Sequence, residues 1–357
     1  MPFDLDDRFA PTETARQHRD RQLVSGWLFT VCFMLLVMVA LGGATRLTGS
    51  GLSIMEWAPL SGALPPLSHA EWERLYGLYQ RIPQSTLVNA GIGLDGFKHI
   101  FWLEWTHRLW GRLIGVVFLV PLLVFWWRGA IRRGLWLRLA ALFALGGLQG
   151  AVGWFMVASG FFAGSTAVSA YRLVIHLALA LSLYAAILWT ALSVRDPRPA
   201  KPAGSRAFRS LMTACCALVG VTIVAGGFVA GLHAGLVYNT FPLMAGQVAP
   251  PDYAALSPWL RNLTENIAAV QFDHRLLATL TALVVAATVA VGLRSARSLA
   301  VRRAASAMGI AVLAQYALGV ATLLWVVPVA LATAHQAVAV LLLTTALVTL
   351  HFERRSP

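Results

Sequence analysis

The segment EWTHRLWGRLIGVVFLVPLLVFWW, residues 104–127, decides the fold class of this chain. Beyond Arg112 it carries no charged residue, and its length meets the roughly 20 apolar residues that an α-helix needs to cross a bilayer. Seven more segments have this property, and they lie near residues 24–45, 136–157, 172–193, 210–230, 273–293, 304–327 and 333–352. The sequence therefore predicts an all-α membrane protein with eight transmembrane helices.

Composition and charge agree with this fold class. Hydrophobic residues make up 58% of the chain and charged residues only 12%, which excludes an ordinary soluble protein. The net charge of +13 would suit a nucleic-acid partner, but the basic residues gather in segments that alternate with the spans, namely 8–21, 128–138, 195–209, 294–303 and 354–355. By the positive-inside rule these segments and both termini are cytoplasmic, and no nucleic-acid partner is expected.

The amino-terminal region indicates the cellular location. The first apolar segment is expected to be a retained span, because it lacks the small-residue cleavage site of a signal peptide. The preceding arm contains five acidic residues, unlike an acid-poor mitochondrial transit peptide; they are Asp4, Asp6, Asp7, Glu13 and Asp20. The expected location is therefore a bacterial inner (cytoplasmic) membrane, where lipid surrounds the spans.

An internal repeat divides the spans into two groups of four. EWTHRLWGRLIG (104–115) matches QFDHRLLATLTA (271–282), LQGAVG (148–153) matches AQYALG (314–319), and RLVIHLALAL (172–181) matches ATAHQAVAVL (332–341). A nearly constant offset is typical of internal duplication. The predicted organisation is a cytoplasmic arm (1–23), two pseudo-symmetric four-helix bundles (24–193 and 210–352) joined by a cytoplasmic linker (194–209), and a cytoplasmic tail (353–357).

Four histidines lie a few residues inside the outer starts of the even-numbered spans: His107, His176, His274 and His335. Histidine within a bilayer is costly and usually functional. Two opposed imidazoles can ligate one haem iron, so each half is predicted to hold one pair. Zinc or copper is the rival ligand, and for a single histidine a hydrogen bond to a neighbouring helix is the alternative. The spacing HExxH, common in zinc sites, is absent.

Arginines gather near these histidines on the side where the positive-inside rule disfavours them. The candidates are Arg46, Arg108, Arg172 and Arg275, with Arg112 one turn beyond Arg108. Haem propionates are carboxylates and would suit guanidinium partners. Snorkelling to the interface is the alternative for each arginine.

Glu104 distinguishes the two halves. It lies three residues before His107 and therefore on the same helical face, whereas the matching position in the second half is Gln271. A carboxylate beside a porphyrin can move protons or stabilise positive charge, which marks the first half as the site of chemistry. The alternative is a structural role, with Glu104 pairing with an arginine or orienting an imidazole.

The outer loops and small residues suggest further features. Loop 46–103 is expected to contain an interfacial helix from Ser68, which precedes Glu71 in a capping-box pattern, and a second short helix is expected after Pro250. Glycines close the first and fifth spans, where close helix packing is the favoured interpretation; they are Gly42, Gly43, Gly49, Gly51, Gly226, Gly227, Gly231 and Gly235. Gln149 and Gln315, matched by the repeat, are expected to bond across helices. The three cysteines, Cys32, Cys215 and Cys216, lie within spans, so no redox role is expected.

These motifs together resemble the haem A synthase family, whose members convert haem O to haem A. The resemblance rests on EWTHR (104–108), RLVIHLALAL (172–181), AGLHAGLVYNTFPLM (230–244), NLTENIAAVQFDHR (262–275) and TAHQAVAV (333–340). The chain lacks the outer-loop cysteine pair of some members, which places it in the subgroup without those thiols. The resemblance also leads us to expect Arg or Lys at position 233, where the chain has His233.

The resemblance implies the sites and the reaction. His107 and His176 would flank the substrate haem O, with Glu104 required there, and His274 and His335 would hold a resident haem b. The reaction would oxidise one ring methyl to a formyl group through a hydroxymethyl stage, supplying haem A to terminal oxidases. Haem O synthase would deliver the substrate, an electron donor of unspecified identity would be needed, and a homo-oligomer is left open.

Two other classes of protein fit the residues. A dihaem b-type electron carrier, such as a quinol oxidoreductase subunit, would use both histidine pairs for permanent haems, but the lone Glu104 argues against equal roles. A transporter could have similar parallel repeats. Its spans should carry helix-breaking residues near the midplane, whereas the main glycine clusters here lie at the outer ends.

Overall fold

The computed structural model describes residues 14–197, 206–295 and 298–355. This part of the chain is helical and has no β-strand. Eight helices are long and apolar enough to cross a membrane, which confirms the predicted fold class. They are α1 (Ala15–Leu47), α4 (Gly93–Trp127), α5 (Arg133–Val157), α6 (Ala170–Arg195), α7 (Arg206–Gly231), α9 (Ile267–Ser295), α10 (Leu299–Leu324) and α11 (Val329–Arg355).

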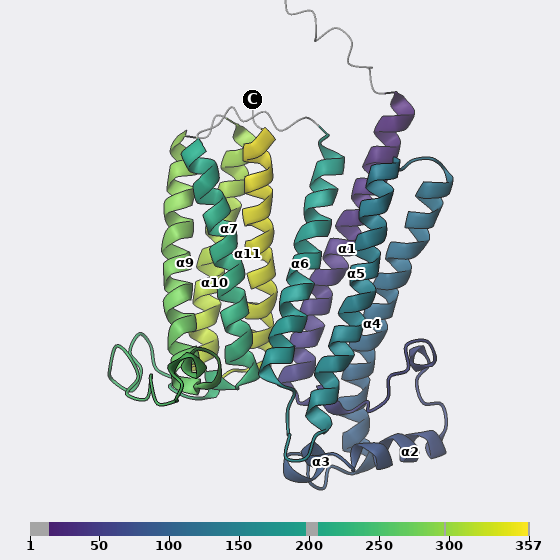
Figure 1. Cartoon of the computed structure of the whole chain (residues 1–357), viewed down its shortest axis with the longest axis vertical. Helices are drawn as coiled ribbons and strands as arrows, with labels where there is room; N and C mark the ends of the chain where they lie inside the picture. The colour runs from purple at the N-terminus through teal and green to yellow at the C-terminus, as the bar shows by residue number, and fades with distance from the viewer. Residues whose placement is uncertain (1–13, 198–205, 296–297, 356–357) are drawn as a thin grey trace, which may run out of the picture.

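The long helices contact one another in two rings of four (Figure 1). In the first ring α1 packs against α4 and α6, and α5 also packs against both. In the second ring α7 and α10 each pack against α9 and α11. The rings meet where α1 packs against α11 and α6 packs against α7, with α6 also touching α11. The helices α4 and α6 therefore stand opposite each other in one ring, as α9 and α11 do in the other.

The functional division of the chain into the predicted segments stays a prediction. Residues 1–13 of the expected arm, 198–205 of the linker and 356–357 of the tail lie outside the described residues. Within the described part, α1 begins and α11 ends at the same end of the molecule, and the long loops lie at the opposite end (Figure 1). We call that opposite end the outer end, in keeping with the predicted topology.

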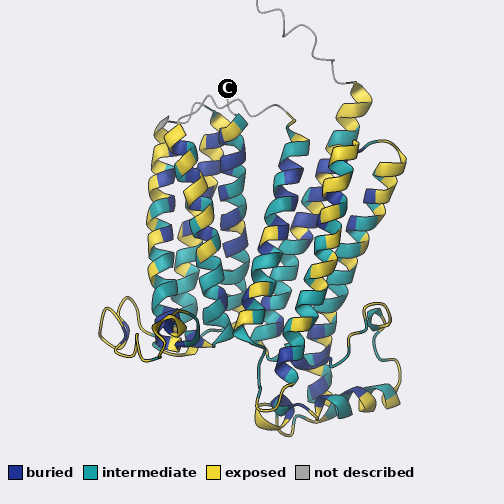
Figure 2. Cartoon of the chain, in the orientation of Figure 1, coloured by how far each residue is buried: buried dark blue, intermediate teal, exposed yellow. Residues whose placement is uncertain are grey.

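The most completely buried core lies toward the end where α1 begins. Its members include Leu28, Leu139, Ile187, Met212 and Met308, all of which have almost no exposed surface. Toward the outer end, most residues of the same helices are only half-buried (Figure 2). Side-chain packing is therefore less complete in the outer part of both rings.

The first outer loop contains a helix at the place where the sequence predicts one, and its interfacial position stays a prediction. Helix α2 (His69–Tyr79) begins after Ser68, whose Oγ accepts a hydrogen bond from the backbone N–H of Glu71 at 3.2 Å. The carboxylate of Glu71 instead binds Arg74, which also pairs with Glu56 and lowers the pKa of both carboxyl groups. The helix is thus fixed to the preceding loop by an exposed ion-pair network.

Helix α4 begins at Gly93, about three turns before the start predicted at residue 104. The added turns bury Phe97 and Phe101 against Trp72 of α2, with ring centroids of Trp72 and Phe101 4.9 Å apart. The polar residues of this stretch masked the helix in the hydropathy pattern. The extra turns hold the outer loop over the first ring.

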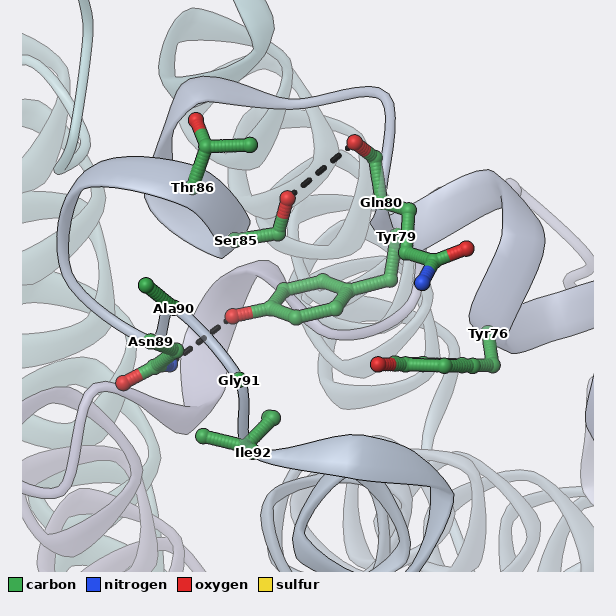
Figure 3. A pocket seen from close by; sticks show the side chains of 9 residues that line it. All are labelled: Tyr76, Tyr79, Gln80, Ser85, Thr86, Asn89, Ala90, Gly91 and Ile92. Carbon is green, nitrogen blue, oxygen red and sulfur yellow. Dashed lines mark hydrogen bonds between the residues drawn. The ribbon is translucent and has the colours of Figure 1, made fainter.

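A cavity of about 300 Å³ lies within this loop, between α2, α3 (Pro83–Leu87) and the start of α4 (Figure 3). The Tyr79 hydroxyl reaches across it and accepts a hydrogen bond from Asn89 at 2.8 Å, and Ser85 donates to the carbonyl of Gln80 at 3.1 Å. The lining residues all come from 76–92, so the cavity is separate from the four histidines.

The second outer loop differs from its prediction. Residues 250–258 form turns rather than a helix, and only the short η6 (Trp259–Arg261) and α8 (Asn262–Glu265) follow. The reason is local, since the Asn262 side chain bonds both the N–H and the carbonyl of Leu256. Such side-chain bonds compete with helical backbone bonds.

Candidate functional site

His107 and His176 come from the opposed helices α4 and α6 of the first ring. In the second ring, His274 of α9 and His335 of α11 have the same relation. The structure thus brings together the histidines that the sequence paired, one pair within each ring.

Each histidine of the first ring lies against a glycine of a neighbouring helix. A methyl group on Gly42 of α1 would lie 3.3 Å from Nε2 of His107. A methyl group on Gly153 of α5 would lie only 2.9 Å from Cε1 of His176. Both glycines lie a little over one turn before the outer ends of their helices. Because Gly42 and Gly153 have no side chain, each imidazole can pack directly against the backbone of the neighbouring helix.

The second ring repeats this arrangement. A methyl group on Gly226 of α7 would lie 3.0 Å from Cε1 of His274, and one on Gly319 of α10 would lie 2.9 Å from Cε1 of His335. The sequence did not assign these contacts to the glycines. The available signal was that Gly153 and Gly319 occupy matched positions in LQGAVG and AQYALG, and Gly42 and Gly226 each begin a Gly-Gly pair.

The second glycine of each pair packs between the rings. Gly43 of α1 faces Gln336 of α11, which also donates a hydrogen bond to the Val39 carbonyl at 3.1 Å. Gly227 of α7 faces Val174 of α6, where a methyl group would lie 3.1 Å from Cγ2. In each Gly-Gly pair, the first glycine therefore contacts a histidine of its own ring, and the second contacts a helix of the other ring.

Two matched glutamines approach the histidines, as expected for bonds across helices. Nε2 of Gln149 lies 3.1 Å from Nδ1 of His176 and donates to the His176 carbonyl at 3.0 Å. Nε2 of Gln315 lies 3.4 Å from Nε2 of His335. These contacts restrict the orientation of the two imidazoles.

The surroundings of the histidines fit a planar apolar ligand. All four side chains lie inside their rings yet stay only half-buried, because packing there is incomplete. Nδ1 of His274 and Nδ1 of His335 are buried without a hydrogen-bond partner, which is uncommon for buried polar atoms. Among the described residues, no three His, Cys, Asp or Glu side chains converge as a metal-ion cage would require. Two imidazoles per ring match haem ligation better than a zinc site.

Glu104 is buried and fully engaged by the protein. Its Oε2 accepts hydrogen bonds from Ser53 Oγ at 2.7 Å and from the Ile54 N–H at 2.8 Å. Its Oε1 accepts from Nε and Nη2 of Arg108 at 3.0 and 2.6 Å. A buried carboxylate is stable only when it is paired and hydrogen-bonded in this way. Glu104 therefore holds the loop after α1 against α4.

Arg108 completes this clamp. Beyond Glu104, its guanidinium donates to the carbonyls of Glu56 at 3.0 Å and Ile54 at 2.7 Å, and it lies 5.5 Å from the ring of Trp154. These bonds use most of its donors. The predicted role of Arg108 toward a propionate stays a prediction, and its observed partners are protein groups.

Gln271 and Arg275 form the corresponding clamp in the second ring. Nη2 of Arg275 donates to Gln271 Oε1 at 2.8 Å and to the Tyr238 carbonyl at 2.6 Å. Nε2 of Gln271 donates to the carbonyls of Ala234 and Val237. The amide suits this loop because it offers carbonyls, whereas the first loop offers a hydroxyl and an N–H to Glu104. The difference between Glu104 and Gln271 thus has a structural component.

The other two candidate arginines have fewer partners. Arg46 donates to the Ala230 carbonyl at 2.9 Å and so links α1 to the end of α7. Arg172 donates to the Phe155 carbonyl at 2.8 Å and stacks on the Phe155 ring at 3.8 Å. His233 follows α7, and burial, together with the charge of Arg46, lowers its pKa. These contacts leave donor capacity on Arg46 and Arg172 for an anionic group.

The clamp makes a specific prediction for Glu104→Gln. The new amide would direct an NH₂ group at Arg108 or at the Ile54 N–H, leaving a buried donor without an acceptor at a cost of about 1–3 kcal/mol. For the reaction that the sequence resemblance implies, we expect loss of most haem A formation with accumulation of the hydroxymethyl stage, measured by mass spectrometry of extracted porphyrins. Glu71→Gln on the exposed face of α2 is the control and should keep full output. Full output from Glu104→Gln would remove the carboxylate from the reaction.

Comparison with known proteins identifies relatives along almost the entire chain. The model of the cytochrome oxidase assembly protein family matches residues 25–347. The heme A synthase of Granulibacter bethesdensis is 63% identical over 335 residues, covering 94% of this chain and 88% of that protein. The heme A synthase of Rhodospirillum centenum is 50% identical over 93% of this chain and 88% of its own length. That of Nitrosospira multiformis is 45% identical over 98% of this chain and 99% of its own.

Proposed function

Because this chain belongs to the haem A synthase family of cytochrome oxidase assembly proteins and is a multi-pass membrane enzyme of haem A synthesis, we propose that it oxidises a ring methyl of haem O to a formyl group. The reaction passes through a hydroxymethyl stage. The observation that carries the proposal is the pair of opposed histidines in each ring of helices, each imidazole fitted against a glycine.

In this proposal the first ring binds the substrate. His107 and His176 ligate the iron of haem O from opposite faces, since they come from opposed helices of the ring. Gly42 and Gly153 fix the positions of the two imidazoles, and Gln149 orients His176. Arg46 and Arg172 bind the propionates with the donors that their protein contacts leave over, and Arg108 stabilises the adjoining loop.

In the second ring His274 and His335 would hold a resident haem b. Their glycine contacts and their half-buried surroundings support this role. When bound, haem b would supply one-electron transfer. Gly226, Gly319 and Gln315 set the positions of its ligands, and Arg275 fixes the loop above them.

Glu104 takes part in the reaction as a proton acceptor in this proposal. If both axial positions of the substrate iron are filled, dioxygen reaches that iron only when one histidine leaves it. The other route removes electrons from the porphyrin, after which water attacks the oxidised methyl group. Both routes release protons, and Glu104 is the buried carboxylate on the face of His107. The Arg108 pair keeps this carboxylate in place.

The cellular setting follows from the same proposal. The protein lies in the bacterial inner membrane with both termini cytoplasmic, and a haem O synthase delivers its substrate within the bilayer. An electron donor or acceptor completes the reaction, and assembly with further copies of the chain is compatible with it.

A dihaem electron carrier is the second candidate, and one observation favours it. The clamps formed by Glu104 with Arg108 and by Gln271 with Arg275 are equivalent in position, which equal roles of the two rings would explain. In that case both histidine pairs would hold permanent haems.

Co-expression with a haem O source tests the function. We expect mass spectrometry of extracted porphyrins to detect haem A and a smaller amount of the hydroxymethyl compound. The empty vector and a His107→Ala variant are the controls, and both should leave haem O unconverted. If the unsubstituted chain also leaves haem O unchanged while its purified form carries two haems, the electron-carrier proposal replaces the synthase proposal.

A further inference from the structure

Residues 57–67, WAPLSGALPPL, form an apolar outer loop between α1 and α2. Leu60, Leu64 and Leu67 are 86%, 73% and 85% exposed, and the segment contains no charged residue. Contiguous exposed apolar surface of this kind marks an interaction site in most proteins. The position of the loop identifies what it contacts.

The loop lies against the membrane-spanning part of α4. Arg112 of α4 donates from Nε to the Pro59 carbonyl at 2.9 Å and from Nη2 to the Ala58 carbonyl at 2.7 Å. Arg112 is one turn further into the membrane than Arg108, which itself is beyond His107. Figure 1 shows the chain leaving α1, rising beside α4 and then returning outward to α2. The loop is therefore set back from the outermost part of the protein toward the bilayer.

Part of the backbone of the loop is hydrogen-bonded within the protein. Gly62, Ala63 and Leu64 donate their N–H groups to carbonyls within the loop at 3.1, 3.1 and 3.2 Å. Three prolines have no N–H to satisfy; they are Pro59, Pro65 and Pro66. Arg112 binds two of the carbonyls, and its own charge is held on the protein side of the loop. Irregular backbone that faces lipid must keep its remaining polar groups hydrated, so the leucine side chains, and not the backbone, would enter the acyl region.

We propose that this apolar outer loop is seated in the outer leaflet of the bilayer, with Leu60, Leu64 and Leu67 among the upper acyl chains. Its partner is lipid, because the loop accompanies the spanning part of α4 and carries no charge that would hold it in water. Residues 53–56, which the Glu104 and Arg108 clamp binds, immediately precede the loop. Lipid contact thus steadies the segment that the clamp holds.

Spin labelling of the full chain in phospholipid nanodiscs tests the proposal. Leu60→Cys and Leu64→Cys are labelled separately, and collision with oxygen, which concentrates in lipid, is compared with collision with a water-soluble nickel chelate. The unsubstituted chain, with its native cysteines Cys32, Cys215 and Cys216, is labelled in parallel to subtract background. Glu73→Cys on α2 is the aqueous reference, and Val120→Cys on the exposed face of α4 is the lipid reference.

We expect the oxygen-to-nickel collision ratio at positions 60 and 64 to exceed that at position 73 at least about threefold and to approach that at position 120. A ratio equal to that at position 73 would place the loop in water and overturn the proposal. Low collision with both reagents would mean that protein covers the loop, which also overturns it. A circular dichroism spectrum equal to that of the unsubstituted chain establishes that each variant is folded.

Discussion

Gly153→Val is expected to reduce haem A formation by at least about tenfold, because precise ligand geometry controls such sites. A Cβ at this position lies 2.9 Å from Cε1 of His176, closer than real contacts allow, and the valine methyl groups extend further. The imidazole must then rotate or the helices α5 and α6 must separate. Either change removes His176 from the position opposite His107.

Gly150→Val provides a matched control for this prediction. Gly150 lies on the same helix less than one turn away, it is exposed, and a methyl group there would meet no atom within 4 Å. Both variants carry the same intrinsic cost or gain of placing valine in α5. Product analysis in membranes with equal amounts of protein should therefore separate the contact with His176 from any general effect on the helix. Equal output from the two variants would contradict a role for the glycine.

The corresponding change in the second ring, Gly319→Val, should change the haem b absorbance of the purified protein. A Cβ there lies 2.9 Å from Cε1 of His335, so the haem b that we propose for this ring should be lost or its absorbance shifted. Gly153→Val should leave that absorbance in place. This contrast follows because each glycine contacts a histidine of its own ring.

The bilayer explains why so much of the fold could be predicted. Spanning helices must be long, apolar and internally hydrogen-bonded, so hydropathy alone located all eight of them. The early start of α4 at Gly93 was missed because Asp95, Lys98 and His99 lower the hydropathy of those turns. Their Phe97 and Phe101 are held by aromatic contacts with α2 that hydropathy does not describe.

The histidine pairs were predictable because the repeat places them at matched depth, and depth in a membrane is fixed by sequence position along a helix. Their glycine neighbours were not predictable, since the distance between helices decides whether a glycine faces an imidazole or another helix. Gly42 and Gly43 are adjacent, yet Gly42 faces the imidazole of His107 whereas Gly43 faces Gln336 of α11.

The interpretation of Glu104 depended on long-range contacts as well. The sequence contrasts a carboxylate with Gln271 and suggests chemistry in the first ring. The structure adds that Ser53 and Ile54 offer donors to Glu104, whereas Ala234 and Val237 offer acceptors to the amide. Loop conformation therefore accounts for part of a difference that the sequence attributes to catalysis.

Replacing single histidines should separate the two rings most clearly. We expect His274→Ala to abolish the haem b signal in reduced-minus-oxidised spectra of the purified protein and to abolish haem A formation. His107→Ala should abolish haem A formation while keeping the haem b signal. The physical reason is that, if each pair ligates a haem iron as we propose, removing one imidazole weakens iron binding in its own ring and leaves the other pair intact.

Two further variants control for unfolding. The carboxylate of Asp273, next to His274 in the chain, accepts a hydrogen bond from the Tyr253 hydroxyl at 2.9 Å and does not bond the histidine. Asp273→Ala should therefore retain the haem b signal. Thr106→Ala beside His107 removes a hydroxyl that bonds the Trp102 carbonyl within its own helix, and should retain haem A formation. The expected pattern thus depends on the imidazoles and not on any substitution at these helix positions.

One result would overturn the proposal that the first ring binds the substrate and the second ring holds a resident haem b. If His107→Ala removes as much haem b absorbance as His274→Ala, both pairs hold permanent haems, and the equivalent clamps of Glu104 and Gln271 would then reflect equal roles. If instead the haem b signal depends only on His274 and His335 while product depends on all four histidines, the first pair acts on a transient ligand. Since the two rings share helix order, glycine contacts and loop clamps, such a difference in occupancy would come from positions at which their residues differ, among them Glu104 and Gln271.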